Sequence, residues 1–168
     1  RRQGQIVSNL PDSTEVLVIG GGIVGCSIAY HLTKLGIKDV VLLEQNQLTA
    51  GTTWHAAGLV GQLRATANLT HLARYTTELF AGLEDETGQA TGYRRTGSLS
   101  LALNTERLEE LNRQASTARA FGIEVEQISA ADVATHWPDV NIEDVCGAVY
   151  LPGDGQTNPV DTTQALAA

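Results

Sequence analysis

The chain has 168 residues, of which 42% are hydrophobic and 18% are charged, and its formal net charge is −8. This composition suits a globular domain, or a large part of one, and excludes a disordered segment. Scattered Lys and Arg argue against a nucleic-acid partner, because phosphate binding needs clustered basic side chains. No apolar run approaches the roughly 20 residues that a membrane-spanning helix requires.

Residues 1–14 form a polar segment without the apolar region of a secretory signal, and we expect the folded domain to occupy residues 15–168. The chain has no methionine and ends in QALAA, which is typical of a helix start, so we expect an N-terminal fragment of a longer protein. Cys26 and Cys146 have no partners at metal-ligand spacing. We expect both to be reduced thiols in the core, and we predict no metal site.

The first predicted elements form a βαβ unit between Glu15 and Glu44. EVLVIG predicts a strand, GGIVGCSIAYHLTKLG predicts a helix that Gly36 ends, and KDVVLLE predicts a second strand. Both strands are apolar on both faces, which is typical of parallel strands covered by helices on each side. The chain then enters the loop GTTWHAAGL.

Hydrophobic periodicity and end signals predict the elements that follow. They are a helix over about 68–86, a half-buried strand over 97–103, a helix over about 105–121 capped by Asn104, a strand over 123–128, a short helix that starts at a Ser129/Asp132 capping box and ends at Trp137-Pro138, a strand over 147–152, a PGDG turn formed by Asp154, and a helix that starts at Asn158-Pro159.

Gly20, Gly22 and Gly25 form G-x-G-x-x-G between the first strand and its helix. The first glycine allows a tight turn, the second lets the main chain approach a pyrophosphate, and the third lets helix and strand pack closely. Free N–H groups and the positive end of the helix would meet the phosphate charge. Glu44 follows about 20 residues later and can accept a hydrogen bond from a ribose hydroxyl, while its charge disfavours NADP.

This pattern predicts an adenine dinucleotide but leaves NAD and FAD open, because both use the same turn. A simple nicotinamide enzyme would continue promptly with further βαβ repeats. Here a small-residue loop, a long helix and an alternating strand follow instead. That organisation favours a flavoprotein whose cofactor domain is interrupted by insertions.

From Glu15 through TAGTTWHAAGL the sequence resembles the sarcosine and dimethylglycine dehydrogenase family, flavoenzymes of the D-amino-acid-oxidase type. The similarity continues through LEDETGQATGYRRTGSLSLAL and LPGDGQTNPVDTTQALA. It implies an α/β fold with a Rossmann-like FAD-binding βαβ domain of that type. Most of the substrate domain would then lie beyond residue 168.

The resemblance also implies that FAD is covalently attached through His55. A neutral imidazole is nucleophilic and can add to the 8α-methyl position of an oxidised flavin. The competing interpretation is that His55 is a polar loop residue beside a packed Trp54. The full set of residues assigned to the cofactor is Gly20, Gly22, Ile23, Val24 and Gly25 at the pyrophosphate turn, Glu44 and Gln45 at the ribose, and Gly51, Thr52, Thr53, Trp54, His55, Ala56, Ala57, Gly58 and Leu59 along the flavin.

The activity that the resemblance implies is oxidation of a small N-methyl amino acid, sarcosine or dimethylglycine. A hydride equivalent passes from the N-methyl carbon to FAD, and the resulting iminium hydrolyses to formaldehyde or gives its carbon to tetrahydrofolate bound beyond residue 168. The catalytic acid and base and the electron acceptor stay unassigned. Such an enzyme is expected in the cytoplasm of a bacterium or the mitochondrial matrix of a eukaryote.

Two alternatives stay open. One is a non-catalytic regulatory protein similar to the regulatory subunit of pyruvate dehydrogenase phosphatase, which lacks the histidine of the motif. The other is an amino-acid oxidase of the glycine oxidase type with non-covalent FAD. Arg64 could meet a substrate carboxylate or the cofactor, or be a solvated surface residue. His31 and His71 are expected on helix surfaces or half-buried, and nothing assigns His136 a role in a site.

Overall fold

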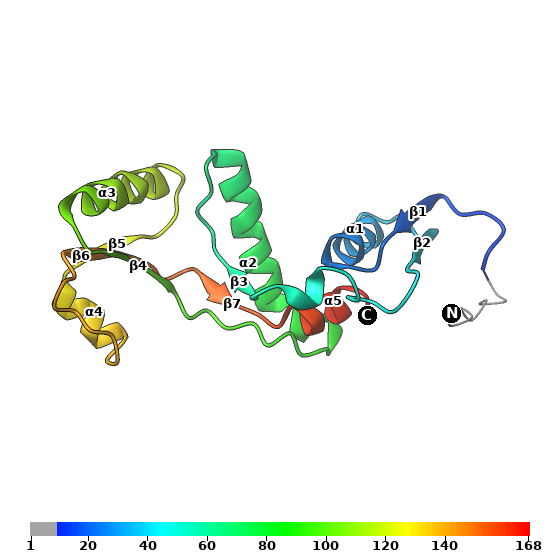
Figure 1. Ribbon diagram of the computed structural model, residues 1–168. Helices are drawn as coiled ribbons and strands as arrows, with labels where there is room; N and C mark the ends of the chain where they lie inside the picture. The colour runs from blue at the N-terminus through cyan, green and yellow to red at the C-terminus, as the bar shows by residue number, and fades with distance from the viewer. Residues whose placement is uncertain (1–9) are drawn as a thin grey trace.

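The computed structural model describes residues 10–168. The elements in chain order are β1 (Val16–Ile19), α1 (Ile23–Lys34), β2 (Val40–Leu43), the 3-10 turn η1 (Thr53–His55), β3 (Leu59–Val60), α2 (Ala67–Thr87), β4 (Ser98–Ala102), α3 (Thr105–Ala120), β5 (Glu126–Ile128), α4 (Ala130–His136), β6 (Gly147–Leu151), β7 (Gly155–Gln156) and α5 (Pro159–Leu166). The molecule is elongated, with β1, β2 and α1 at one end and β4, β5 and β6 with α3 and α4 at the other (Figure 1). Between them lie α2, α5 and the β3–β7 pair.

The βαβ unit forms as predicted. β1 and β2 are parallel, with Val16 opposite Val40 and Ile19 opposite Leu43, and α1 makes the crossover. The helix ends where Gly36 was expected to end it. The Gly36 amide donates to the Thr33 carbonyl at 3.0 Å and the next amide donates back to Leu32, which satisfies two carbonyls of the last turn.

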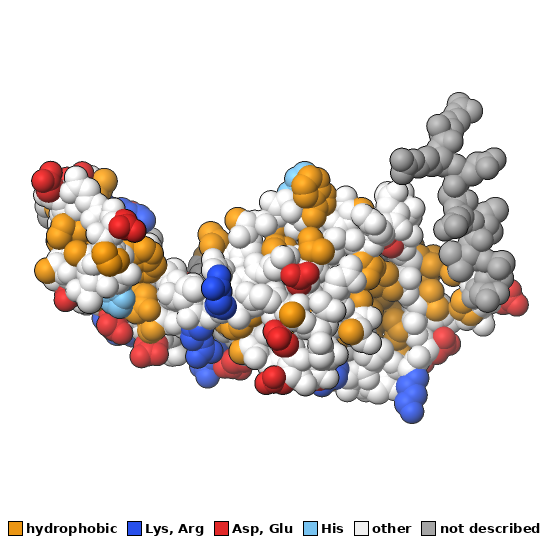
Figure 2. All heavy atoms as spheres, turned by 90° about the horizontal axis from the view of Figure 1, so that it is seen from below, with side chains coloured by type: hydrophobic (Ala, Val, Ile, Leu, Met, Phe, Trp, Pro, Cys, Tyr) orange, Lys and Arg blue, Asp and Glu red, His pale blue; other side chains and the backbone are white. Residues whose placement is uncertain are grey.

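Only one face of β1 is covered by the described residues. Val18 is buried, whereas Leu17 is 50% exposed and Ile19 is 81% exposed. The prediction of two covered faces is therefore wrong for this strand, because one crossover helix can pack against only one side of a sheet. Figure 2 shows hydrophobic side chains on the surface at this end of the molecule.

The other end is built around an antiparallel sheet of order β4-β6-β5. The apolar stripe of α3 packs on it, with Leu111, Ala115 and Ala118 against Ala102 and Val149. The Asn104 side chain accepts a hydrogen bond from the Arg107 amide at 2.8 Å, as expected of an N-cap. The strand predicted over 123–128 is shorter, since only 126–128 pair with β6, although Ile123 and Val125 before it are buried.

A second core joins α1, α2 and α5. It contains Cys26, Phe80, Leu83, Ala165 and Leu166. Burial raises the pKa of the Cys26 thiol, with the nearby Glu44 carboxylate adding to the effect. This cysteine is the core thiol that was predicted.

Cys146 is exposed, which corrects the prediction of two buried thiols. It lies directly before β6, where its amide donates to the Ala102 carbonyl of β4 at 2.8 Å while the residue stays exposed. The capping box at Ser129 is confirmed, because Ser129 and Asp132 each accept the backbone amide of the other.

Within residues 10–168, no helix is both long and apolar enough to cross a membrane. In the same part of the chain, no three His, Cys, Asp or Glu side chains come together as a metal-binding group.

Candidate functional site

The β1–α1 turn has the tight geometry that its glycines predicted. Gly20 has φ +111°, a conformation that favours glycine. A Cβ on Gly25 would lie 1.9 Å from the Gly20 carbonyl oxygen, so helix and strand can approach only without it. Gly21 is also closely packed, with a Cβ position 2.6 Å from Leu48 Cδ2 and 2.9 Å from Glu44 Cβ, and the motif did not identify it because its second position is open.

The N-terminus of α1 presents free donors at this turn. Gly22 is the N-cap, in an extended conformation, and as a glycine it has no side chain to accept a hydrogen bond from the helix amides. The first helical hydrogen bond runs from the Cys26 amide to Gly22 at 3.0 Å. The amides of Gly22, Val24 and Gly25 donate to no acceptor among residues 10–168. Free amides at the positive end of a helix form an anion-binding site.

Glu44 lies beside this turn at the end of β2. Its carboxylate accepts the Gly21 amide at 2.8 Å and the Asn46 amide at 3.0 Å. These two hydrogen bonds, the Gly21 bond first, lower the pKa of Glu44 below its usual value. A carboxylate has about four acceptor positions, so Glu44 can still accept from a ribose hydroxyl while it holds the turn.

Thr53 connects the small-residue loop to the glycine turn. Its hydroxyl oxygen accepts a hydrogen bond from the Ile23 amide at 3.0 Å, and the residue is 6% exposed. The sequence suggested donors to a cofactor at Thr52 and Thr53. In the structure the Thr53 hydroxyl instead accepts a hydrogen bond from the first amide of α1, whereas Thr52 is exposed. This hydrogen bond therefore attaches the loop to the first turn of α1.

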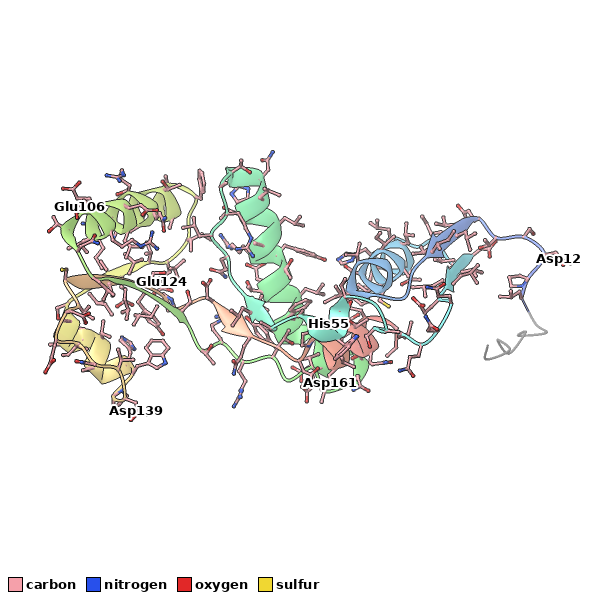
Figure 3. The ribbon with its side chains drawn as sticks, viewed as in Figure 1. Asp12, His55, Glu106, Glu124, Asp139 and Asp161 are labelled. Carbon is pink, nitrogen blue, oxygen red and sulfur yellow. The ribbon has the colours of Figure 1, made fainter. Side chains whose placement is uncertain are left out.

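His55 ends η1 near the middle of the molecule, beside α5 (Figure 3). Its ring stacks on Trp54, with centroids 3.7 Å apart and the planes tilted by 36°. Both residues are exposed, Trp54 at 58%, so the loop does not bury its tryptophan. The imidazole makes no hydrogen bond to another described residue. It is therefore accessible to a ligand.

After His55 the chain is fixed against the segment that leads into α5. Gly58 has φ +74°, and a Cβ there would lie 2.1 Å from the Thr157 carbonyl oxygen. The Thr157 amide donates to the Gly58 carbonyl at 2.9 Å, and β3 then pairs with β7. The remaining predicted loop residues are on the surface: Gln45, Gly51, Ala56, Ala57 and Leu59.

Two other predicted residues take different positions. Arg64 is exposed, donates to the Leu63 carbonyl at 2.8 Å and lines an open cleft of about 550 Å³, which agrees with a solvated surface arginine. Asp154 is more than a turn residue. It is 7% exposed and accepts from the Gln62 amide and the Ser98 hydroxyl, contacts that sequence spacing could not indicate.

The histidines outside the loop stay away from the glycine turn. His31 is half-buried on α1, where its Nε2 pairs with the Tyr75 hydroxyl at 2.9 Å, and His71 is exposed on α2, as expected. His136 stacks on Tyr150 in the sheet at the far end, with ring centroids 4.4 Å apart.

The residues that are present fit an adenine dinucleotide. Three free amides meet the requirement of a pyrophosphate, the absent Cβ atoms of the turn allow close approach, and Glu44 retains acceptor capacity for a ribose. The loop that follows exposes the imidazole of His55, and the small residues next to it, Ala56 and Ala57, are exposed as well.

Known proteins share this sequence closely. Human mitochondrial sarcosine dehydrogenase is 43% identical over 94% of the chain, and human mitochondrial dimethylglycine dehydrogenase is 42% identical over 94%. The mitochondrial regulatory subunit of pyruvate dehydrogenase phosphatase from Mus musculus is 44% identical over 95%. The chain covers 17%, 18% and 18% of these relatives, respectively, so it spans less than a fifth of their length.

Solved structures have a similar fold. L-proline dehydrogenase from P. horikoshii superposes with a TM-score of 0.87 at 28% identity, over 94% of this chain and 41% of that one. The family described as FAD dependent oxidoreductase (DAO) matches residues 15–168. This span includes the glycine turn, Glu44 and the His55 loop. The chain therefore belongs to the DAO family of FAD-dependent oxidoreductases and has its FAD-binding fold.

Proposed function

We propose that the protein oxidises the N-methyl carbon of a small N-methyl amino acid, sarcosine or dimethylglycine, with FAD covalently attached through His55. The observation that carries the proposal is the hydrogen bond between Thr53 and the Ile23 amide. It joins the turn that suits a pyrophosphate to the loop that exposes His55. One extended cofactor could therefore contact both.

In this proposal the glycine turn, Glu44 and residues 51–59 each contact a different part of FAD. The Gly22, Val24 and Gly25 amides hold the pyrophosphate, and Glu44 accepts from the adenosine ribose. Residues 51–59 line the flavin, and His55 forms the covalent attachment. When bound, FAD supplies the two-electron acceptor for the N-methyl carbon.

The substrate class rests on the relatives. The names of two of them, at 43% and 42% identity, state dehydrogenation of sarcosine and of dimethylglycine. Removal of hydride from the N-methyl carbon leaves an iminium. Addition of water then gives formaldehyde and the demethylated amine, or tetrahydrofolate takes the carbon if a folate site exists elsewhere in the protein. Both of these relatives are mitochondrial by name, so we expect a mitochondrial protein if the source is a eukaryote; for a bacterial source we expect a cytoplasmic one.

The 44% identical regulatory subunit supports a second candidate, a non-catalytic regulatory protein. A third candidate is an amino-acid oxidase with non-covalent FAD, because a glycine oxidase from Geobacillus kaustophilus is 29% identical over 91% of the chain. The exposed imidazole of His55 favours the first proposal. A regulatory protein has no chemical need for it, and a non-covalent flavin needs no nucleophile.

Acid precipitation of the purified full-length protein separates the three candidates. We expect a yellow pellet, acid-stable flavin, and formaldehyde formation from sarcosine or dimethylglycine. Non-covalent flavin would stay in the supernatant, and a protein with neither flavin nor amine oxidation would fit the regulatory role. His55→Ala should remove the colour from the pellet, whereas His71→Ala, an exposed histidine on α2, should leave it. A yellow His55→Ala pellet would refute the attachment site.

A further inference from the structure

Residues 58–62, here called the strap, connect the His55 loop to the segment that leads to α2. The strap lies along residues 154–157. At one end the Thr157 amide donates to the Gly58 carbonyl at 2.9 Å, and in the middle Leu59 and Val60 pair with Gln156 and Gly155. A ladder of two residue pairs is too short to fix its own register, so the contacts at its ends decide where it lies.

Asp154 makes the contact at the far end of the strap. Its Oδ1 accepts the Gln62 amide at 2.8 Å, and Asp154 and Gln62 are 7% and 9% exposed. The Gln62 side chain donates to the Thr77 hydroxyl at 2.9 Å, which ties the same residue to α2. Because a buried carboxylate is costly unless it accepts hydrogen bonds, this contact defines one position for the strap.

The second carboxylate oxygen of Asp154 serves a different part of the molecule. Oδ2 accepts the Ser98 hydroxyl at 2.6 Å, at the start of β4. The Gly97 amide also donates to the Asp154 carbonyl at 2.9 Å. One side chain therefore links the strap to the β4-β6-β5 sheet, with a separate oxygen for each partner.

We propose that Asp154 is a positioning residue for the cofactor: through the Gln62 amide it fixes the strap, and the strap holds His55 against the flavin. The inference rests on the proposed function. His55 lies only three positions before the strap, so a shift of the short ladder reaches it directly. Small displacements of a reacting group reduce rates strongly.

Three variants separate this role from general stabilisation. Asp154→Ala removes both contacts. Asp154→Asn keeps an oxygen for the Gln62 amide and places an NH₂ group where the Ser98 hydroxyl can accept. Ser98→Ala removes only the contact to β4. If Asp154→Ala does not fold, Asp154→Ser replaces it, because its shorter side chain cannot reach the Gln62 amide.

The measurement is the rate at which acid-stable flavin appears when apoprotein is incubated with FAD, beside the Tm of each variant. We expect Asp154→Ala to be about tenfold slower than wild type, and Asp154→Asn and Ser98→Ala to stay within about twofold. Wild-type rates in Asp154→Ala would overturn the proposal. So would an equal loss in Ser98→Ala at an equal change of Tm.

If the wild-type protein forms no acid-stable flavin, the proposed attachment at His55 fails, and the same variants are compared by their Kd for FAD. A higher Kd in Asp154→Ala alone would still support positioning of the strap. Equal Kd values in all variants would overturn it.

Discussion

At the scale of single residues, the cofactor turn depends on atoms that are missing from its glycines. A Cβ atom on Gly25 would lie 1.9 Å from the Gly20 carbonyl oxygen, which is far closer than two such atoms can approach. The turn at Gly20 and the start of α1 would have to move apart to accept a methyl group there. Gly25 also supplies one of the free amides of the anion site, so a substitution there changes the geometry of the turn and its anion binding together.

Gly25→Ala should therefore abolish FAD binding and lower the Tm. Gly82→Ala is the matched control, because Gly82 lies in α2 with open space around its Cβ position. That change should be neutral or stabilise by up to about 1 kcal/mol. Flavin content and thermal melts of the two purified variants check the prediction, and normal flavin content in Gly25→Ala would contradict it.

Glu44 should make the turn sensitive to acid. Its pKa is lowered in the folded protein because the carboxylate accepts the Gly21 and Asn46 amides. A group with a depressed folded pKa stabilises the fold above its unfolded pKa, about 4.3, and this contribution is lost as the pH falls through the folded value. The difference between wild type and Glu44→Gln should thus be constant above about pH 5 and shrink below it.

Urea unfolding midpoints of wild type and Glu44→Gln, measured from pH 3 to pH 7, test this. The control variant is Glu109→Gln on α3, an exposed carboxylate for which no pair is found among residues 10–168. Its difference from wild type should not vary in this way. A Glu44→Gln difference that stays constant or grows on acidification would contradict the account.

At the scale of elements, periodicity and end signals predicted most of the helices well. The spacing of apolar residues placed α2 over about 68–86, and the structure has it at Ala67–Thr87. Asn104, Ser129 and Asn158 all cap the helices that they were expected to cap. These signals are local, because a helix forms its hydrogen bonds within one segment.

Strands and buried contacts were harder to predict because their partners are distant in the sequence. Nothing local indicates that β3 pairs with β7, or that Asp154 accepts the Gln62 amide. The exposure of Ile19 and Cys146 likewise depends on which elements cover them. At the site, the glycine turn and Glu44 were predictable from spacing, whereas the Thr53 contact to α1 required the fold.

α2 offers a direct test of which face stabilises the molecule. Leu83 is fully buried in the core shared with α1 and α5, whereas Leu72 on the same helix is 61% exposed. Leu83→Ala should destabilise by about 2–5 kcal/mol through lost packing and a cavity. Leu72→Ala should cost about 0.5 kcal/mol or less. Denaturant unfolding of both variants measures the two losses in free energy of unfolding. Equal losses would show that Leu83 does not lie in the core as described.

Over the whole molecule, two hydrophobic cores are joined by the segments around β3 and β7. One core surrounds α3 and the β4-β6-β5 sheet, and the other joins α1, α2 and α5. The β3–β7 pair and Asp154 connect them, and His55 lies beside this connection (Figure 3). A flavin held at the glycine turn and at His55 would extend from one core toward this junction.

Peptide mapping shows whether this flavin is attached to His55. Trypsin cleaves after Lys38 and Arg64, and the peptide 39–64 contains a single histidine, His55. After acid precipitation and digestion, we expect flavin fluorescence and the added mass of FAD on this peptide from the wild type, and neither on the same peptide from His55→Ala. Flavin on a different peptide, or a peptide 39–64 of unmodified mass from protein that oxidises sarcosine or dimethylglycine, would contradict it.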